Sequence, residues 1–346
     1  MGKLKALLTA EIDYEAFRFL EDKIDIEYEG WFQNSEILSE QKMAQLIAGK
    51  DILITSYDPV TKLVIDSSPN LKLIICTRAT PVNIDINYAK EKGIKVSYAP
   101  NRNSDCTAEF TVALMLSITR KIPMAHADLH NGKYTGSENK HVDIRDGLKR
   151  DVTWSLGKDT PYVEYKGMQL KGHKLGIIGY GGIGRRVGAI CHAFGMKILV
   201  SDPYLSKDNV EDYVTLLEFN EVLSQSDIVT VHCKDVPETE KLINAEAFAK
   251  MKKSAFFINT SRGIVVDENA LIEALRQGKI AGAGIDVYDS EPIAINHPYL
   301  KELNNVVTTP HLAGATYDAI TNHTRQLATD ILHFINNEEL EFEYKK

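Results

Sequence analysis

The stretch KLGIIGYGGIGRRVGAICHAFGMKILVSDP, residues 174–203, carries the strongest structural signal in the chain. An apolar strand pattern runs directly into Gly179-x-Gly181-x-x-Gly184, and a helical pattern follows at once. In this order the three glycines provide a tight turn, close backbone approach to a pyrophosphate, and close packing of helix on strand. The N-terminus of that helix offers free N–H groups to the phosphates. The stretch therefore predicts a dinucleotide-binding βαβ unit.

Asp202 ends the second strand pattern of this stretch, 18 residues after Gly184. A carboxylate there accepts hydrogen bonds from the ribose hydroxyls of an adenosine, and its charge repels the 2′-phosphate of NADP. No arginine follows Asp202 closely, and the nearest basic residue downstream is Lys207. We therefore expect NAD as the cofactor. The other interpretation is a glycine-rich turn that binds nothing, with Asp202 as a solvated strand end.

Outward from this stretch, short apolar runs alternate with helical patterns, which predicts βαβ units and parallel sheets. The expected strands are 5–10, 25–29, 52–55, 73–77, 95–97, 175–178, 197–201, 228–232, 255–259, 283–287 and 306–309. The clearest expected helices are 14–22, 39–48, 104–121, 269–277 and 315–336. Pro123 is expected to mark the end of the third of these helices. Six strands from residue 174 onward is the number that a complete dinucleotide-binding domain uses.

The composition indicates a cytoplasmic globular protein. The 346 residues include 40 Lys and Arg against 48 Asp and Glu, and the net charge of −8 repels phosphate backbones and anionic lipids. No apolar run approaches the ~20 residues that span a bilayer, and the N-terminal apolar run is too short for a secretory leader. The four cysteines show no metal-ligand spacing, so we expect no metal and a reducing compartment. We expect neither nucleic acid nor a membrane as a partner.

Three polar clusters follow expected strands in the second half of the chain. They are Thr260-Ser261-Arg262, then Asp286 with Glu291, and finally Thr309-Pro310-His311. Because ligands bind outside the carboxyl ends of parallel strands, we expect all three clusters to edge one crevice.

The residue types in these clusters suit the interconversion of a 2-hydroxy acid and a 2-keto acid. That reaction needs a group that takes the hydroxyl proton and can return it, and histidine is best poised for both near neutral pH. We expect His311 to be this acid/base and Glu291 to orient its ring. Arg262 would supply an always-charged fork for the substrate carboxylate. Taken singly, these residues are ordinary loop or surface residues; their joint occurrence after a nucleotide motif favours catalysis.

At this point the sequence resembles the D-isomer-specific 2-hydroxyacid dehydrogenases, and most closely their D-3-phosphoglycerate dehydrogenase-like branch. The resemblance runs from about residue 71 to residue 336 and rests also on IICTR, NIDINYAKEKGI, APNRNSDCTAEF, INTSRGIVVDENALIEAL, GAGIDVYDSEP and TPHLAGAT. It implies an α/β fold with two doubly wound parallel-sheet domains. A Rossmann NAD-binding domain, residues 103–314, would be inserted in a flavodoxin-like substrate domain, residues 1–102 and 315–346.

The resemblance also implies roles for single residues. Arg262, Glu291 and His311 match the catalytic Arg, Glu and His of the family, and Asp286 matches the acid that holds the nicotinamide carboxamide. The other implied cofactor contacts are Gly182 and Ile183 in the pyrophosphate turn and Cys233, Thr260 and Ser261 in neighbouring loops. We expect Cys233 to be a small core-like residue and not a redox switch.

The expected substrate loop departs from the family pattern. Where the family has R-A-G-x-G-x-D-N-I-D, residues 78–85 read RATPVNID, two residues shorter and without glycine. Arg78 and Thr80 are the expected substrate contacts in this loop. Asp58 stands where phosphoglycerate dehydrogenases tend to have an arginine, which disfavours 3-phosphoglycerate and leaves Arg78 and Arg102 as partial substitutes.

Two further alternatives stay open. Some proteins that resemble this family act chiefly as NAD(H)-sensing interaction proteins, such as corepressors, and turnover would distinguish them from an enzyme.

Residues 136–165 form a charged, weakly periodic excursion that contains Trp154. It is either a solvated loop or an arm that packs on a second subunit. Since family members commonly pair through their NAD domains, we expect a homodimer.

Overall fold

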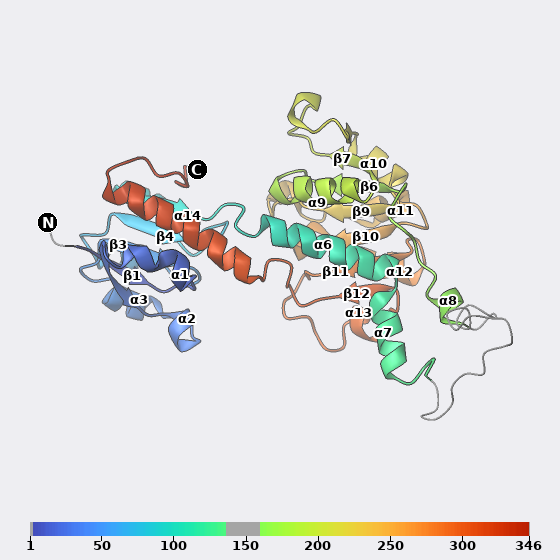
Figure 1. The fold of residues 1–346 in the computed structure, drawn as a ribbon, viewed down its shortest axis with the longest axis horizontal. Helices are drawn as coiled ribbons and strands as arrows, with labels where there is room; N and C mark the ends of the chain where they lie inside the picture. Colours follow the sequence, from blue (N-terminus) through green and yellow to red (C-terminus); the bar gives the residue numbers. More distant parts are fainter. Residues whose placement is uncertain (1–2, 136–159, 346) are drawn as a thin grey trace, which may run out of the picture. The chain divides into compact units, whose positions relative to one another are not determined.

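The computed structural model describes residues 3–135 and 160–345. The chain forms two compact units (Figure 1), a first unit of Met1–Cys106 with Ala315–Lys346 and a second unit of Thr107–Gly314. Both units contain a parallel sheet with helices on its two faces, so the predicted α/β fold class is confirmed. Most of the expected 136–165 excursion, including Trp154, lies outside the described residues.

The sheet of the first unit has the parallel strand order β2-β1-β3-β4-β5. The strands are β1 (Leu4–Leu8), β2 (Ile24–Tyr28), β3 (Ile52–Thr55), β4 (Leu73–Cys76) and β5 (Lys95–Tyr98). The central strands β3 (ILIT) and β4 (LIIC) are continuous apolar runs because both of their faces are covered.

Helices cover both faces of this first sheet. They are α1 (Tyr14–Phe17, continued by a 3-10 turn at Arg18–Leu20), α2 (Trp31–Asn34), α3 (Glu40–Leu46), α4 (Lys62–Asp66), α5 (Ile86–Glu91) and α14 (Tyr317–Ile335). The amphipathic α14, red in Figure 1, buries Leu327, Ala328 and Ile331 with residues of β1, β3 and β4. Residues of α3, α4 and α5 pack on the opposite face.

The sheet of the second unit has the parallel strand order β12-β11-β10-β9-β6-β7-β8. The strands are β6 (Lys174–Ile178), β7 (Lys197–Ser201), β8 (Val214–Leu216), β9 (Ile228–Val231), β10 (Phe256–Asn259), β11 (Gly282–Ile285) and β12 (Val306–Thr308). The order turns back between β6 and β9, which is the switch point where doubly wound sheets bind dinucleotides.

The helices of the second unit are α6 (Ser104–Thr119), α7 (Ile122–His130), α8 (Pro161–Glu164), α9 (Gly182–Ala193), α10 (Phe219–Gln225), α11 (Ala245–Lys250), α12 (Glu268–Arg276) and α13 (Pro298–Lys301). All of them except α7 and α8 bury side chains. Residues of α6 and α9 share one core cluster, and residues of α10, α11 and α12 share another.

Two details of the second unit differ from the expectation. Among the described residues the sheet has seven strands and not six, because the edge strand β8 has only three residues and none of them is fully buried. Pro123 does not end a helix; it lies in the first turn of α7, where its missing N–H costs no hydrogen bond. The preceding helix α6 ends at Thr119, and Lys121 has a φ of 53° between the two helices.

Within residues 3–135 and 160–345, no helix combines the length and apolar character that crossing a membrane requires. No group of three or more His, Cys, Asp or Glu side chains in these residues is arranged to hold a metal ion.

Candidate active site

The predicted nucleotide turn joins β6 to α9 as expected. Gly179 has a φ of +85°, and a Cβ there would lie 2.9 Å from the carbonyl carbon of His232. A Cβ at Gly184 would lie 2.5 Å from the backbone oxygen of Gly179. Packing therefore requires both of these glycines. A Cβ at Gly181 would meet no protein atom within 4 Å, so the protein's own packing does not explain this glycine.

The surroundings of the turn fit a dinucleotide. No side chain caps the N-terminus of α9 at Gly181, which leaves its first N–H groups available to phosphate oxygens. Asp202 accepts the N–H of Tyr180 at 2.8 Å through Oδ2 and the N–H of Tyr204 at 3.0 Å through Oδ1. These bonds hold the Asp202 carboxylate between the glycine turn and the end of β7.

Cys233 and His232 lie beside this turn as uncharged groups. The thiol of Cys233 donates to the backbone oxygen of Ile178 at 3.5 Å, and burial raises its pKa to about 11. A thiol with that pKa is a poor nucleophile at neutral pH. Burial also lowers the pKa of His232 to about 3, and its Nε2 lies 3.0 Å from the hydroxyl of Thr230.

His311 and Glu291 are in direct contact. His311 Nδ1 lies 2.7 Å from Glu291 Oε2, and Glu291 Oε1 accepts the N–H of Tyr288 at 3.1 Å. An ionised carboxylate only accepts hydrogen bonds, so Nδ1 of His311 carries the hydrogen. The ring's Nε2 has no partner within the described parts of the chain. The His311 side chain is 47% exposed, so Nε2 is free to exchange a proton with a ligand.

Asp286 holds the loop that carries His311. Its carboxylate is fully buried and accepts from the hydroxyl of Thr309 at 2.6 Å and from the N–H groups of Leu312 and Ala313 at 2.8 and 2.9 Å. The N–H of His311 donates to the backbone oxygen of Asp286 at 2.9 Å, and His311 has a φ of 55°. This positioning role could not be predicted from the sequence, because it rests mainly on backbone groups more than 20 residues away.

The Arg262 loop is shaped by Asn259 at the end of β10. Asn259 Oδ1 accepts the N–H and hydroxyl of Ser261 at 3.0 and 2.9 Å, and its Nδ2 donates to the backbone oxygen of Arg262 at 3.0 Å. This is an Asx turn, and the Asn-x-Ser spacing could have predicted it. The hydroxyl of Thr260 lies 2.7 Å from that of Thr111 in α6.

The three predicted clusters follow β10, β11 and β12, which are neighbours in the sheet. A Cβ at Gly263 would lie 2.0 Å from the backbone oxygen of Tyr288, so the Arg262 loop lies directly against the loop that carries Glu291. Arg262 is exposed and forms no ion pair with any described carboxylate. Its Nη1 donates to the backbone oxygen of Ser261 at 2.7 Å. The edge of the sheet therefore presents a guanidinium without a carboxylate partner and a histidine–carboxylate pair from adjoining loops.

The expected substrate contacts Arg78 and Thr80 belong to the first unit. The Arg78 guanidinium lies over the Tyr57 ring, 4.8 Å from its centroid, and Thr80 is exposed. Asp58, the residue that disfavours 3-phosphoglycerate, is fully buried; its Oδ1 accepts the N–H of Leu38 at 2.8 Å, and its Oδ2 has no partner among the described residues.

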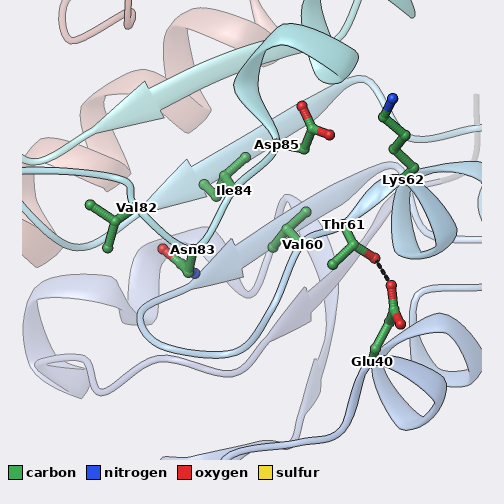
Figure 2. A pocket seen from close by; sticks show the side chains of 8 residues that line it. All are labelled: Glu40, Val60, Thr61, Lys62, Val82, Asn83, Ile84 and Asp85. Carbon is green, nitrogen blue, oxygen red and sulfur yellow. Dashed lines mark hydrogen bonds between the residues drawn. The ribbon is translucent and has the colours of Figure 1, made fainter.

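The first unit also contains a cavity of about 520 Å³ (Figure 2). It is lined by Glu40, Val60, Thr61, Lys62, Val82, Asn83, Ile84 and Asp85. Its polar side chains already have partners in the protein. The Thr61 hydroxyl donates to Glu40, and Asp85 accepts the N–H of Tyr88 at 3.0 Å. Asn83 Nδ2 donates to the backbone oxygen of Asp58 at 2.8 Å, which ties the 78–85 loop to the end of β3.

Comparisons with known proteins show to which family the chain belongs. The family model described as "D-isomer specific 2-hydroxyacid dehydrogenase, NAD binding domain" matches residues 112–313. The chain is 35% identical over 332 residues to D-3-phosphoglycerate dehydrogenase of Archaeoglobus fulgidus, covering 95% of this chain and 57% of the relative. It is 36% identical over 304 residues to glyoxylate reductase of Thermofilum pendens, covering 87% of this chain and 83% of the relative.

A solved structure shares the whole architecture. D-lactate dehydrogenase from Escherichia coli has a TM-score of 0.75 and 26% sequence identity, and the match covers 99% of each chain. The predicted family and the predicted NAD cofactor are thus confirmed. The chain belongs to the D-isomer-specific 2-hydroxyacid dehydrogenase family, and its second unit contains the NAD-binding domain of that family.

Proposed function

We propose that this protein is an NAD-dependent oxidoreductase that interconverts a small D-2-hydroxy acid and its 2-keto acid. The observation that carries the proposal is the 2.7 Å contact between His311 Nδ1 and Glu291 Oε2. The loop that carries Glu291 lies against the loop that carries Arg262. These groups lie at the carboxyl edge of an NAD-binding sheet, where ligands of such sheets bind. Relatives named glyoxylate reductase and D-3-phosphoglycerate dehydrogenase support this class of reaction.

The chain's own part of the reaction is proton transfer and positioning. Bound NADH supplies the hydride that C2 of the keto acid accepts. His311 Nε2 donates a proton to the carbonyl oxygen, and in the reverse direction it takes the proton of the hydroxyl group. Glu291 holds the ring through Nδ1 and stabilises the imidazolium, while the guanidinium of Arg262 pairs with the substrate carboxylate.

The proposed cofactor contacts surround the glycine turn and the strand ends next to it. They are Gly179, Gly181, Gly182, Ile183, Gly184, Asp202, Cys233, Thr260, Ser261 and Asp286. For Asp286 this is an additional role: Oδ2 accepts one bond from the protein, and a carboxylate oxygen has room for two. It can therefore also accept from the nicotinamide carboxamide. Arg78 and Thr80 are proposed substrate contacts.

The test is consumption of NADH against glyoxylate, pyruvate, hydroxypyruvate, phenylpyruvate and phosphohydroxypyruvate. The wild-type chain and the His311→Asn variant are compared, because asparagine tolerates the positive φ of this position. We expect saturable turnover with at least one acid and a loss of ~10²-fold or more in the variant, with NADH affinity unchanged. NADH binding without turnover on any acid would contradict the proposal and favour a sensor.

We further propose a cytoplasmic homodimer paired through the NAD domains. All four cysteines are free thiols, as a reducing compartment would keep them.

The exposed helix α7 supports the dimer. No side chain of α7 is buried, and Ile122 and Leu129 are 54% and 52% exposed. Sedimentation of the chain without residues 136–165 tests the dimer: we expect a shift toward monomer, and an unchanged profile would show that this segment does not pair subunits.

A further inference from the structure

Two histidines of helix α7 (Figure 1) lie outside the glycine turn and the three loops of the candidate active site. His126 and His130 are four residues apart, so they lie one turn apart on the same face of the helix. Their ring centroids are 4.0 Å apart, with an angle of 41° between the ring planes. Both side chains are exposed. The helix therefore presents two imidazole groups side by side to solvent.

One of the two rings is held as a metal ligand would be. Nδ1 of His130 lies 3.0 Å from the backbone oxygen of His126. A carbonyl oxygen only accepts, so Nδ1 carries a hydrogen, and in the uncharged ring the free electron pair is on Nε2. Histidines that bind metals usually donate their other ring N–H to a carbonyl or carboxylate in this way. The backbone therefore selects the tautomer in which Nε2 of His130 can bind a metal ion.

The charged groups near the end of α7 are engaged with one another. Nζ of Lys133 forms ion pairs with Asp128 and Glu164, so its positive charge is compensated. Neither His126 nor His130 forms an ion pair with a residue that the structure describes. His130 is also the last residue of the helix, where the partial negative charge of the helix end favours a cation. The local field thus favours a bound cation at this pair.

Two imidazole groups one helical turn apart suit a divalent transition-metal ion. Imidazole is a ligand of Zn²⁺, Ni²⁺ and Cu²⁺, and histidines at positions i and i+4 hold zinc in H-E-x-x-H enzymes. Here residues 126–130 read HADLH, without the glutamate that acts as the base in those enzymes. Among the described residues no third His, Cys, Asp or Glu completes the set. The pair therefore supports binding of an ion whose other positions are filled by water.

Helix α7 is held only weakly by packing. It has nine residues, none of its side chains is fully buried, and no side chain caps its N-terminus at Lys121. Isolated helices of this length are marginal in water. An ion bound to both histidines joins two successive turns, so it would stabilise the helix where packing does not.

We propose that His126 and His130 bind one divalent transition-metal ion, through Nε2 of His130 and a ring nitrogen of His126, and that this ion stabilises α7. Both histidines belong to the second unit, so the site lies within one unit. It shares no residue with the proposed catalytic and cofactor contacts, and it does not depend on the proposed oxidoreductase activity.

The first arm of the experiment measures binding of the metal alone. ZnCl₂ and NiCl₂ are titrated calorimetrically, each by itself and at neutral pH, into the full chain without an affinity tag. The compared variants are His126→Gln, His130→Gln and the matched control His192→Gln, which removes an exposed histidine of α9 in the same unit. We expect the wild-type chain and His192→Gln to bind one ion per chain, and the other two variants to bind it about tenfold or more weakly.

A double variant tests the spacing of the pair. Ala125→His combined with His126→Ala keeps the number of histidines but places the two five residues apart, on different faces of the helix. We expect this variant to bind Zn²⁺ and Ni²⁺ as weakly as His126→Gln. The NADH affinity of every variant, measured by fluorescence, shows whether its second unit is folded.

The second arm measures the effect of the ion on α7. Backbone hydrogen exchange is followed with and without saturating Zn²⁺. We expect Zn²⁺ to slow exchange of the α7 N–H groups about tenfold or more in the wild-type chain and to have no such effect in His126→Gln. Acidification should abolish the slowing, because protons compete with the ion for imidazole.

The two arms separate the outcomes. Weaker binding in both single variants and in the double variant, together with slower exchange of α7, supports the proposal in full. Equal affinity in the wild-type chain and both single variants, or no binding by the wild-type chain, overturns the site. Wild-type affinity in the double variant overturns chelation by the pair. Binding without slower exchange overturns the stabilising role of the ion.

Discussion

The N–H of His311 donates to the backbone oxygen of Asp286 at 2.9 Å, and the Asp286 carboxylate accepts the N–H groups of the two residues that follow His311. One fully buried residue thus fixes the loop on which the proposed acid/base lies. The backbone of His311 has a positive φ, so these hydrogen bonds also hold a conformation that most side chains disfavour.

Asp286→Asn should reduce both stability and activity. An amide nitrogen cannot accept, so at least one N–H of the 309–313 loop loses its partner, at a cost of about 1–3 kcal/mol. We expect a lower thermal unfolding midpoint and a fall in kcat. Asp289→Asn is the control, since Asp289 is exposed. A normal midpoint together with normal kcat would show that the loop does not depend on this carboxylate.

Glu291→Gln should reduce activity and leave folding unchanged. The amide keeps the size of the side chain but removes the charge that faces His311, and it no longer dictates which ring nitrogen is protonated. We expect kcat/KM to fall between about 10-fold and 10⁴-fold, with the NADH affinity unchanged. The exposed Glu246 provides the matched variant Glu246→Gln. Equal kinetics of the two variants would remove Glu291 from the mechanism.

Arg262→Lys should affect turnover far more than stability. An ammonium group cannot reproduce the two parallel hydrogen bonds of a guanidinium to a carboxylate. We expect kcat/KM to fall by about tenfold or more, which corresponds to about 1.4 kcal/mol of transition-state stabilisation. Steady-state kinetics and thermal unfolding measure the two effects separately. Retention of more than about half of the wild-type kcat/KM, under 1 kcal/mol, would disprove the proposed carboxylate contact.

Gly181→Ala should separate cofactor binding from folding. The backbone of Gly181 has φ −81° and ψ −155°, which any residue adopts, and its Cβ would meet no protein atom within 4 Å. We expect an unchanged unfolding midpoint and an NADH dissociation constant raised by about tenfold or more, by fluorescence titration. Gly184→Ala should instead lower the midpoint, since its Cβ would lie 2.5 Å from a backbone oxygen. Wild-type NADH affinity in Gly181→Ala would place the pyrophosphate elsewhere.

His323 should make the protein less stable as the pH falls. Burial lowers the pKa of His323 to about 4 from an ordinary value of 6.5, so between these pH values the unfolded chain binds a proton that the folded chain does not. Stability is therefore lost from pH 6.5 downward, at up to about 1.4 kcal/mol per pH unit for this group. The unfolding midpoint of His323→Gln should fall less between pH 7 and pH 5 than that of wild type. Equal decreases in the two proteins would contradict the shift.

The architecture was predictable because its strands are short, buried apolar runs separated by helical patterns. The same reasoning missed β8, which has only three residues, none of them fully buried. The contact of His311 with Glu291 was predictable from the residue types at strand ends, and the catalytic roles of these residues stay a prediction. The positioning contacts were not: Asp286 acts on backbone groups, and the Arg102–His323 contact joins residues 221 positions apart.

The return of the chain to the first unit has a consequence for protein synthesis. The core of that unit includes Leu327 and Ile331 of α14, and His323 of the same helix holds Arg102. A ribosome therefore finishes every residue of the second unit before it makes the last helix of the first. We infer that the N-terminal sheet, with one apolar face covered only in part by α1, waits on the nascent chain while the NAD-binding unit folds, and is the part most in need of chaperone protection.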